Sequence, residues 1–274
     1  MTLDTGIAHR RWSWRRRNAA PRVSPLVALA TGWLLIVLIV ALAADLIAPY
    51  DFQAMDLRNR LSAPGLTGDA LAHPLGTDHL GRDILSRLFV SIRISILIAL
   101  FGTLIGALVG VVLGFTAAHF RGIVDEAIMV LVDFQASMPF IIIALAVLAF
   151  FGNSFSLFLI VVGLQGWERY ARITRGLALS AMARGYAVAV RTLGGNASYV
   201  YARHILPNIG SALVVQMTLN FPETILLETS LSFLGLGIQP PMVSLGSMLG
   251  YGRDYLLDAW WIAVIPGIAI FVTT

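Results

Sequence analysis

Long apolar runs constrain this chain more than any other feature of its sequence. The run from Leu26 to Ala48 exceeds the roughly 20 residues that a helix needs to cross a bilayer. Further runs predict five more spans, and the expected set is 26–48, 93–118, 127–150, 155–174, 209–234 and 259–274. Only 12% of the residues are charged, which is far below the share of about 25% in soluble domains. We therefore expect an all-α, polytopic membrane protein with about six transmembrane helices.

The arginines predict the orientation of these spans. All 19 basic residues are arginine, and six of them lie in the tail 1–25. With the N-terminus inside, the inner segments hold thirteen arginines and the outer segments five, while Arg93 lies at the edge of a span. The positive-inside rule therefore predicts a cytoplasmic N-terminus. We expect the tail to anchor the first span at the lipid surface and not to bind nucleic acid.

The spans divide the chain into three regions. Residues 1–25 form the basic tail, and residues 26–92 contain the first span and an extracytoplasmic loop at 49–92. Residues 93–274 form the membrane core, which includes a cytoplasmic segment at 175–208. The chain has no lysine and no cysteine, which excludes a P-loop lysine, a Schiff-base lysine and thiolate metal sites. We expect no cofactor, no metal and no catalytic residue, so any ATP would be bound by another chain.

Four glycines spaced by four residues mark the second span. They are Gly102, Gly106, Gly110 and Gly114. This spacing lines them along one face of a helix, where the missing side chains let another backbone approach closely. A hinge or a pore lining is the alternative, but the spacing favours a helix-packing ridge.

Polar residues within the spans are the candidates for a solute path. Gln216, Asn220 and Glu223 fall within an arc of roughly 80° on the fifth helix, and Pro222 interrupts the same stripe. Such residues must face protein or water because charges are costly in lipid. A solute path and hydrogen bonds to neighbouring helices both remain open. Asp133 in the third span could relay protons, but a buried contact between helices is favoured.

The cytoplasmic segment 175–208 predicts two short helices. The first presents one apolar face, because its apolar residues follow the spacing i, i+3, i+4, i+7; they are Tyr186, Ala189, Val190 and Leu193. Gly194 is expected to end it in a left-handed turn, and a second helix should run from Tyr199 to Ile205. Such an amphipathic helix could dock in a groove of a partner protein or lie flat on the lipid headgroups.

This segment resembles the cytoplasmic signature of the permeases of binding-protein-dependent ABC importers. The signature reads Glu-Ala-Ala, three residues, Gly, nine residues, a hydrophobic position, one residue and Leu-Pro. The matching residues here are Val188, Ala189, Val190, Gly194, His204, Leu206 and Pro207. Val188 stands at the position of the family's glutamate, and Val190 at that of its second alanine.

Other stretches point to one branch of that family, the C-type subunit of dipeptide and oligopeptide permeases. These stretches are 73–83, 231–237, 252–254, 260–261 and 266–267. The resemblance implies a type I ABC importer permease fold in the plasma or inner membrane. It also implies three kinds of partner: a sibling permease subunit, two cytoplasmic ATP-binding subunits and an extracytoplasmic solute-binding protein.

The resemblance implies roles for residues on both sides of the membrane. The residues expected to couple to the ATPases are Tyr186, Val188, Ala189, Val190, Leu193, Gly194, His204, Leu206 and Pro207. The solute would be a dipeptide, a longer peptide, glutathione, an opine or a nickel chelate. The main alternative is an ion- or proton-coupled secondary transporter that uses Asp133, Glu223 or Glu228 as its coupling charge. A membrane scaffold that transports nothing would leave the polar stripe of the fifth span unexplained.

Overall fold

The computed structural model describes residues 24–65, 72–183 and 196–274, and these ranges are helical apart from loops and one isolated β-bridge between Thr77 and Asp83. The α-helices are α1 Pro25–Ile47, α2 Ile84–Phe120, α3 Gly122–Ser137, α4 Phe140–Phe151, α5 Phe155–Gly163, α6 Trp167–Met182, α8 Ala197–Val200, α9 Leu206–Phe233, α10 Leu245–Gly252 and α11 Trp261–Thr273. Short 3₁₀ turns cover Leu57–Asn59 and Arg253–Tyr255, and a π-helical segment covers Tyr201–Ile205. The expected all-α fold is confirmed.

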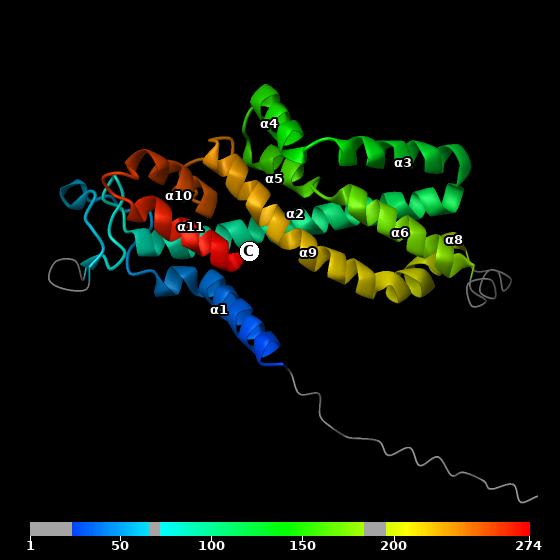
Figure 1. Ribbon diagram of the computed structural model, residues 1–274, viewed down its shortest axis with the longest axis horizontal. Helices are drawn as coiled ribbons and strands as arrows, with labels where there is room; N and C mark the ends of the chain where they lie inside the picture. Colours follow the sequence, from blue (N-terminus) through cyan, green and yellow to red (C-terminus); the bar gives the residue numbers. More distant parts are fainter. Residues whose placement is uncertain (1–23, 66–71, 184–195) are drawn as a thin grey trace, which may run out of the picture.

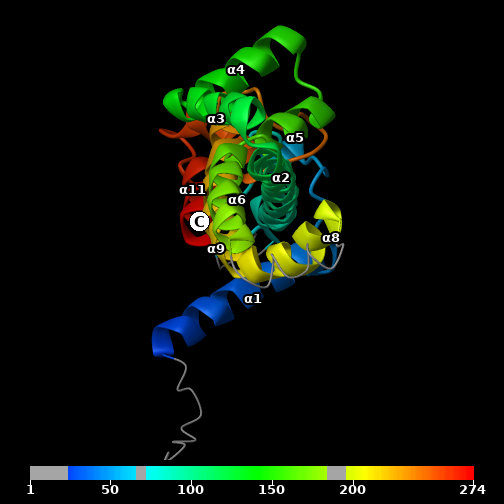
Figure 2. The same cartoon turned by 90° about the vertical axis from the view of Figure 1, so that its right-hand side faces the viewer.

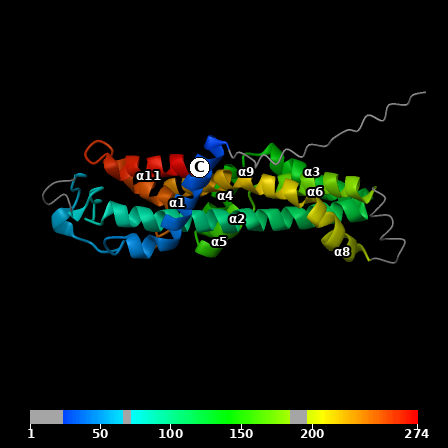
Figure 3. The same cartoon turned by 90° about the horizontal axis from the view of Figure 1, so that it is seen from below.

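Helix α2 is the axis of the molecule. It runs along nearly the full length in Figures 1 and 3, with α6 and α9 beside it at one end and α10 and α11 at the other. Its 37 residues exceed the predicted span 93–118 at both ends. The helix begins early because Asp83 caps it, accepting a hydrogen bond from the Ser86 amide at 2.8 Å. It ends at Arg121, whose φ of 54° turns the chain toward α3.

The glycine ridge packs as the spacing predicts. A Cβ atom added to Gly106 would lie 2.8 Å from the Gln165 carbonyl oxygen and 2.9 Å from that of Gly163. One added to Gly114 would lie 2.6 Å from the Ala171 carbonyl oxygen. The backbones of α5 and α6 therefore approach α2 as closely as glycine permits. The helix-packing interpretation of the ridge is confirmed.

Two of the predicted spans are broken helices. The span at 127–150 divides into α3 and α4, which meet at an angle of 92°. Met138 takes an extended conformation there, as residues before a proline usually do. The span at 155–174 divides into α5 and α6, and Gly166 with φ 79° turns the chain between them. The expectation of two continuous spans was wrong because it counted apolar residues and ignored these two turns.

Six spans were expected, but the lengths and compositions of the observed helices support only two or three of them as membrane-crossing. Within the described ranges, α1 and α2 are long and apolar enough to cross a membrane, and the bent pair of α3 and α4 makes a third candidate. Helix α9 covers the fifth predicted span at full length, whereas α11 has 13 residues. Helix α1 packs loosely and diverges from the bundle in Figure 2, with only Ala41 and Ala44 fully buried along it.

The second short helix predicted in the cytoplasmic segment does not stand apart. Helix α8, the π-helical segment and α9 follow one another without a break, so the chain is helical from Ala197 to Phe233. Pro207 lies in the first turn of α9, where its missing N–H is tolerated. The first predicted helix, with Tyr186 to Gly194, lies outside the described residues.

Candidate functional site

Polar side chains meet where the two broken helices come together. Gln135, near the end of α3, donates a hydrogen bond to the Leu164 carbonyl at 3.1 Å and lies 3.2 Å from a Glu168 carboxylate oxygen. The indole N–H of Trp167 donates to the Gln135 side chain at 2.7 Å. We call Gln135, Trp167 and Glu168 the break cluster. It holds the two breaks against each other although they are about thirty residues apart in the chain.

The break cluster lies at the level of the middle of α2. Gly163 and Gln165, which flank the second break, pack on Gly106 near the centre of that helix. On another side, Gly166 packs on the fully buried side chain of Asn220 in α9. Non-helical backbone at membrane depth is tolerated only where it is buried in protein or lines water. The break between α5 and α6 is thus packed between α2 and α9. The residues of α6 that follow it include side chains on the exposed surface of the bundle.

Three arginines emerge from α6 just after the break, each paired with a carboxylate of a neighbouring helix. Arg169 donates to Glu223 of α9 at 2.6 Å, and Arg172 donates to Asp133 of α3 at 2.8 Å. Arg175 binds both carboxylate oxygens of Asp125 of α3. The arginines are three residues apart, so each pair lies about 4.5 Å further along α6 than the one before. We call these three pairs the charge ladder.

The first two pairs of the ladder are exposed. The side chains of Arg169 and Glu223 are 46% and 41% exposed, and those of Arg172 and Asp133 are 53% and 72% exposed. A charged side chain facing lipid near the bilayer centre costs at least about 2.5–3.5 kcal/mol on insertion scales. Any of these four groups that lies within the bilayer must therefore face a partner chain or water and not lipid.

The structure separates the residues that the sequence proposed for a path. Of the three on α9, Asn220 is buried against Gly166, Gln216 is half-buried, and Glu223 alone reaches an exposed charge pair. The expectation that Asp133 is buried between helices was wrong, because its carboxylate contacts α6 only at the surface. Sequence reasoning also missed Arg169 and Arg172. The signal was present, since both lie inside the predicted apolar span 155–174, where arginine is rare.

Glu228, the other candidate coupling charge, is completely buried among hydroxyl groups. Its carboxyl group accepts hydrogen bonds from Ser95 of α2 at 3.1 Å and from Ser232 of α9 at 2.7 Å. The Ser95 oxygen also accepts from the Leu245 amide at the start of α10, at 3.1 Å. Glu228 and Ser95 therefore connect α9, α2 and α10 at the end of the bundle that carries α10.

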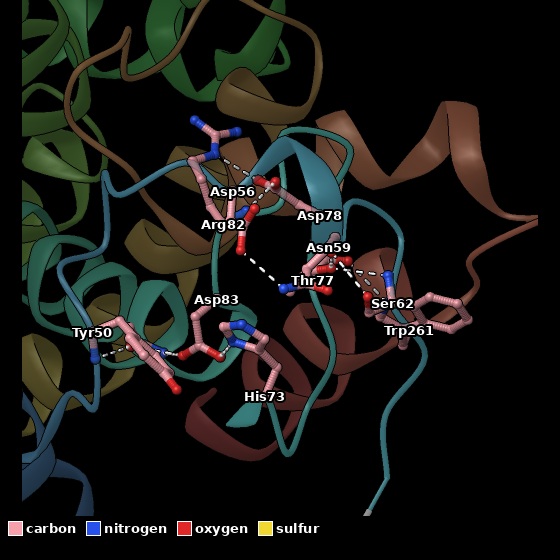
Figure 4. A network of polar contacts seen from close by, with 11 residues as sticks. Tyr50, Asp56, Asn59, Ser62, His73, Thr77, Asp78, Arg82, Asp83 and Trp261 are labelled. Carbon is pink, nitrogen blue, oxygen red and sulfur yellow. Dashed lines mark hydrogen bonds and ion pairs between the residues drawn. The ribbon is translucent and has the colours of Figure 1, made fainter. Parts of the chain in front are cut away.

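A second polar network lies at that same end, in the segments 48–65 and 72–83 with their neighbour α11, which together we call the loop end (Figure 4). Asp78 accepts hydrogen bonds from its own loop backbone and from Arg82 Nε at 2.7 Å. Asp83 lies 2.9 Å from His73 Nδ1, and the Trp261 indole donates to the Thr77 carbonyl at 3.2 Å. Both aspartates are almost fully buried. The charges in 73–83 thus bind groups of the loop itself, and the loop packs against α2 and α11.

Burial also changes the ionisation of this loop. Partial burial lowers the pKa of His79, and the nearby guanidinium groups of Arg82 and Arg87 lower it further while Asp78 opposes them. The imidazole stacks on Tyr255, with ring centroids 5.2 Å apart. The neutral form of His79 is therefore the one that the folded loop end favours.

Three of the residues expected to couple to ATPases lie within the described ranges. His204 is in the π-helical segment and its ring packs on Tyr199 at 5.3 Å between centroids. Leu206 and Pro207 begin α9. The other six, from Tyr186 to Gly194, lie outside the described residues.

Comparisons with known proteins agree on one family. Residues 110–274 match the family described as "Binding-protein-dependent transport system inner membrane component". The chain is 36% identical over 249 residues to the glutathione transport system permease protein GsiD of Pectobacterium atrosepticum, covering 90% of this chain and 81% of that protein. It is 36% identical over 264 residues to the dipeptide transport system permease protein DppC of Escherichia coli, covering 96% and 86%.

Solved structures give the same fold. The chain superposes on an inward-facing structure of the MetNI methionine ABC transporter with a TM-score of 0.51, covering 69% of this chain and 88% of that one. Sequence identity in this superposition is 17%, so the likeness concerns the fold alone.

Proposed function

This chain belongs to the family of binding-protein-dependent transport system inner membrane components, and from this premise we propose that it is the permease subunit of an ATP-driven importer of peptides or similar small solutes. The names of its relatives support this, since they describe permeases for dipeptides, di- and tripeptides and glutathione. Membership of this family replaces the alternative of an ion-coupled secondary transporter.

The subunit would work within a complex. We propose a sibling permease, two cytoplasmic ATP-binding subunits and an extracytoplasmic solute-binding protein as its partners. The observation that carries this is the exposed pair of Arg169 and Glu223, because two charges at the level of the helix breaks need protein or water beside them. A sibling permease facing α6 and α9 across a solute path supplies both.

The orientation follows from the arginine distribution. We propose that the N-terminus is cytoplasmic, which makes the loop end extracytoplasmic and brings the segment 184–195 to the cytoplasmic side. Residues from Tyr186 to Gly194 would then form the helix that seats in the ATP-binding subunits, with His204, Leu206 and Pro207 linking it to α9. Closure of those subunits would rock the permeases between two states, which is alternating access by rigid-body motion.

Uptake and purification together test this proposal. A strain lacking this chain should lose uptake of radiolabelled dialanine or glutathione, and the intact gene should restore it. A tag on this chain should recover the sibling permease and the ATP-binding subunits, whereas the chain purified alone should not hydrolyse ATP. Unchanged uptake of both peptides in the deletion strain, or ATP hydrolysis by the isolated chain, would contradict the proposal.

The coupling role can be tested at Gly194. A side chain there costs about 1 kcal/mol or more if the residue is left-handed. The larger expected effect is mechanical, because a misdirected helix cannot seat in the ATP-binding subunit. Gly194→Val should leave the membrane abundance of the chain nearly unchanged and reduce uptake strongly. Full uptake with full recovery of the ATP-binding subunits would show that the coupling helix has been assigned to the wrong segment.

A further inference from the structure

We propose that the first two pairs of the charge ladder, Arg169 with Glu223 and Arg172 with Asp133, bind the charged termini of a zwitterionic solute inside the membrane domain. This inference rests on the proposed function and adds to it a binding site of stated chemistry. Arginine would hold the carboxylate of the solute, and Glu223 or Asp133 its ammonium group. The ligand class is a short peptide with free N- and C-termini.

The exposure of these pairs is the first argument. The third pair, between Arg175 and Asp125, is more covered, with side chains 33% and 15% exposed and two hydrogen bonds between them. It has the geometry of a structural bridge between α6 and α3. In each of the first two pairs the arginine makes a single hydrogen bond to the carboxylate of the neighbouring helix. Donor and acceptor capacity therefore remains free in both of these pairs.

The second argument is the place of the pairs in the fold. They follow directly on the break cluster, which lies at the level of the middle of α2, next to the turn at Gly166 that packs on Asn220. Secondary transporters place solute sites where helices are interrupted near the bilayer midplane, and the same physical reasoning applies to an interrupted helix in this fold. Glu168, which is nearly buried in the break cluster, lies 3.7 Å from Arg169 Nε, so the guanidinium has a second carboxylate beside it when Glu223 changes partner.

The third argument is the match in dimensions and charge. Successive pairs lie about 4.5 Å apart along α6, and an extended dipeptide spans about 7 Å. A carboxylate on the arginine of one pair would therefore leave the ammonium group near the acid of the next. Exposed ion pairs are weak, so exchanging a protein partner for a solute terminus has a small cost. Arginine can hold a carboxylate through two parallel hydrogen bonds, which favours this exchange.

The test measures binding to the assembled membrane complex in lipid nanodiscs without the solute-binding protein. Uptake measurements in cells first show which peptide is transported, dialanine or glutathione. Ligand-observed NMR titrations then compare that peptide with its N-acetylated and C-amidated forms. We expect each cap to weaken binding to the wild-type complex by about tenfold, because it removes a charge-assisted hydrogen bond.

Single variants separate recognition from a structural role. Arg169→Gln should weaken binding of the N-acetylated peptide, which keeps its carboxylate, and leave the amidated peptide unaffected. Asp133→Asn, which changes the acid of the next pair, should do the reverse. A matched control is the double variant Arg93→Gln with Asp45→Asn, which removes another exposed pair, 2.6 Å long, between α2 and α1. It should bind all three forms as the wild type does.

Three results would overturn the inference. If the complex transports the peptide but does not bind it without the binding protein, the site is absent and the proposed function stands. If Arg169→Gln and Asp133→Asn weaken all three forms equally, the two pairs only hold α6 against α9 and α3. If neither dialanine nor glutathione is taken up by cells, the proposed function and this inference fail together.

Discussion

The loop end and the charge ladder use the same residue types in opposite ways. At the loop end, Asp78 and Asp83 are almost fully buried and each accepts several hydrogen bonds. On the ladder, Glu223 and Asp133 are exposed and each meets one arginine. A buried charge with every oxygen engaged serves to hold a fold together. An exposed ion pair contributes little stability, so this contrast supports a structural role for the loop end and the proposed solute-binding role for the ladder.

The largest expected loss of stability comes from removing a charge at the loop end. Asp78→Ala leaves Arg82 and the nearly buried Arg87 without their carboxylate. Breaking one partner of a buried charge network costs about 3–5 kcal/mol. Membrane abundance and the thermal midpoint in detergent should both fall sharply. The control is Asp254→Ala, which removes an exposed pair with Arg253 and should change neither quantity; equal effects of the two variants would refute the contrast.

The next largest effect concerns the packing that positions the ladder. Gly106→Leu places a side chain where the nearest carbonyl oxygens would lie 2.8 and 2.9 Å from its Cβ atom. Overpacking of this kind costs about 1–3 kcal/mol, and it should push α6 and its arginines away from α2. We expect lower recovery of the assembled complex on size-exclusion chromatography. Gly176→Leu in α6, where nothing lies within 4 Å of an added Cβ, is the matched control. Normal assembly of Gly106→Leu with altered solute preference would mean that the ridge lines the path.

A smaller change in stability is expected on the ladder itself. The double variant Arg169→Gln with Glu223→Gln removes an ion pair that solvent screens, and such pairs contribute about 0–1 kcal/mol. Its thermal midpoint should stay close to that of the wild type while peptide uptake falls. Asp78→Ala should differ from this variant, because its uptake should fall only in proportion to the loss of protein from the membrane. A destabilisation as large as that of Asp78→Ala would place the ladder among the structural networks.

The smallest effect is a pH dependence confined to the loop end. The pKa of His79 is lowered in the folded protein, so the fold favours the neutral imidazole. The stability that this contributes is present above the ordinary histidine pKa of about 6.5 and is lost as the pH falls toward the lower folded value. His79→Phe keeps the stacking on Tyr255 and should flatten the thermal midpoint between pH 7 and pH 5. If the wild type and the variant lose stability in parallel over this range, His79 is not the group responsible.

The sequence alone determined the class of the protein and much of its packing. Apolar runs indicate membrane helices because lipid leaves the backbone no other partner than itself. The spacing of Gly102, Gly106, Gly110 and Gly114 identified the face of α2 on which other backbones lie, because a helix repeats its faces at a fixed interval. The motifs of 73–83 and 188–207 pointed to the family. Each of these inferences depends on residues close together in the chain.

The tertiary structure decided where the helices break and which charges meet. Nothing near Gln135 in the sequence indicates that it binds Trp167 and Glu168, and nothing near Glu223 indicates Arg169, because these pairs are joined by contacts between different helices. The arginines of α6 could have been noticed in the sequence as charges in an apolar run, but their partners could not. Whether a charge is buried, as in Asp78, or exposed, as in Asp133, depends on what the other helices cover. Hydrophobic periodicity records which face of one helix is apolar, whereas exposure is set by all the helices that pack around it.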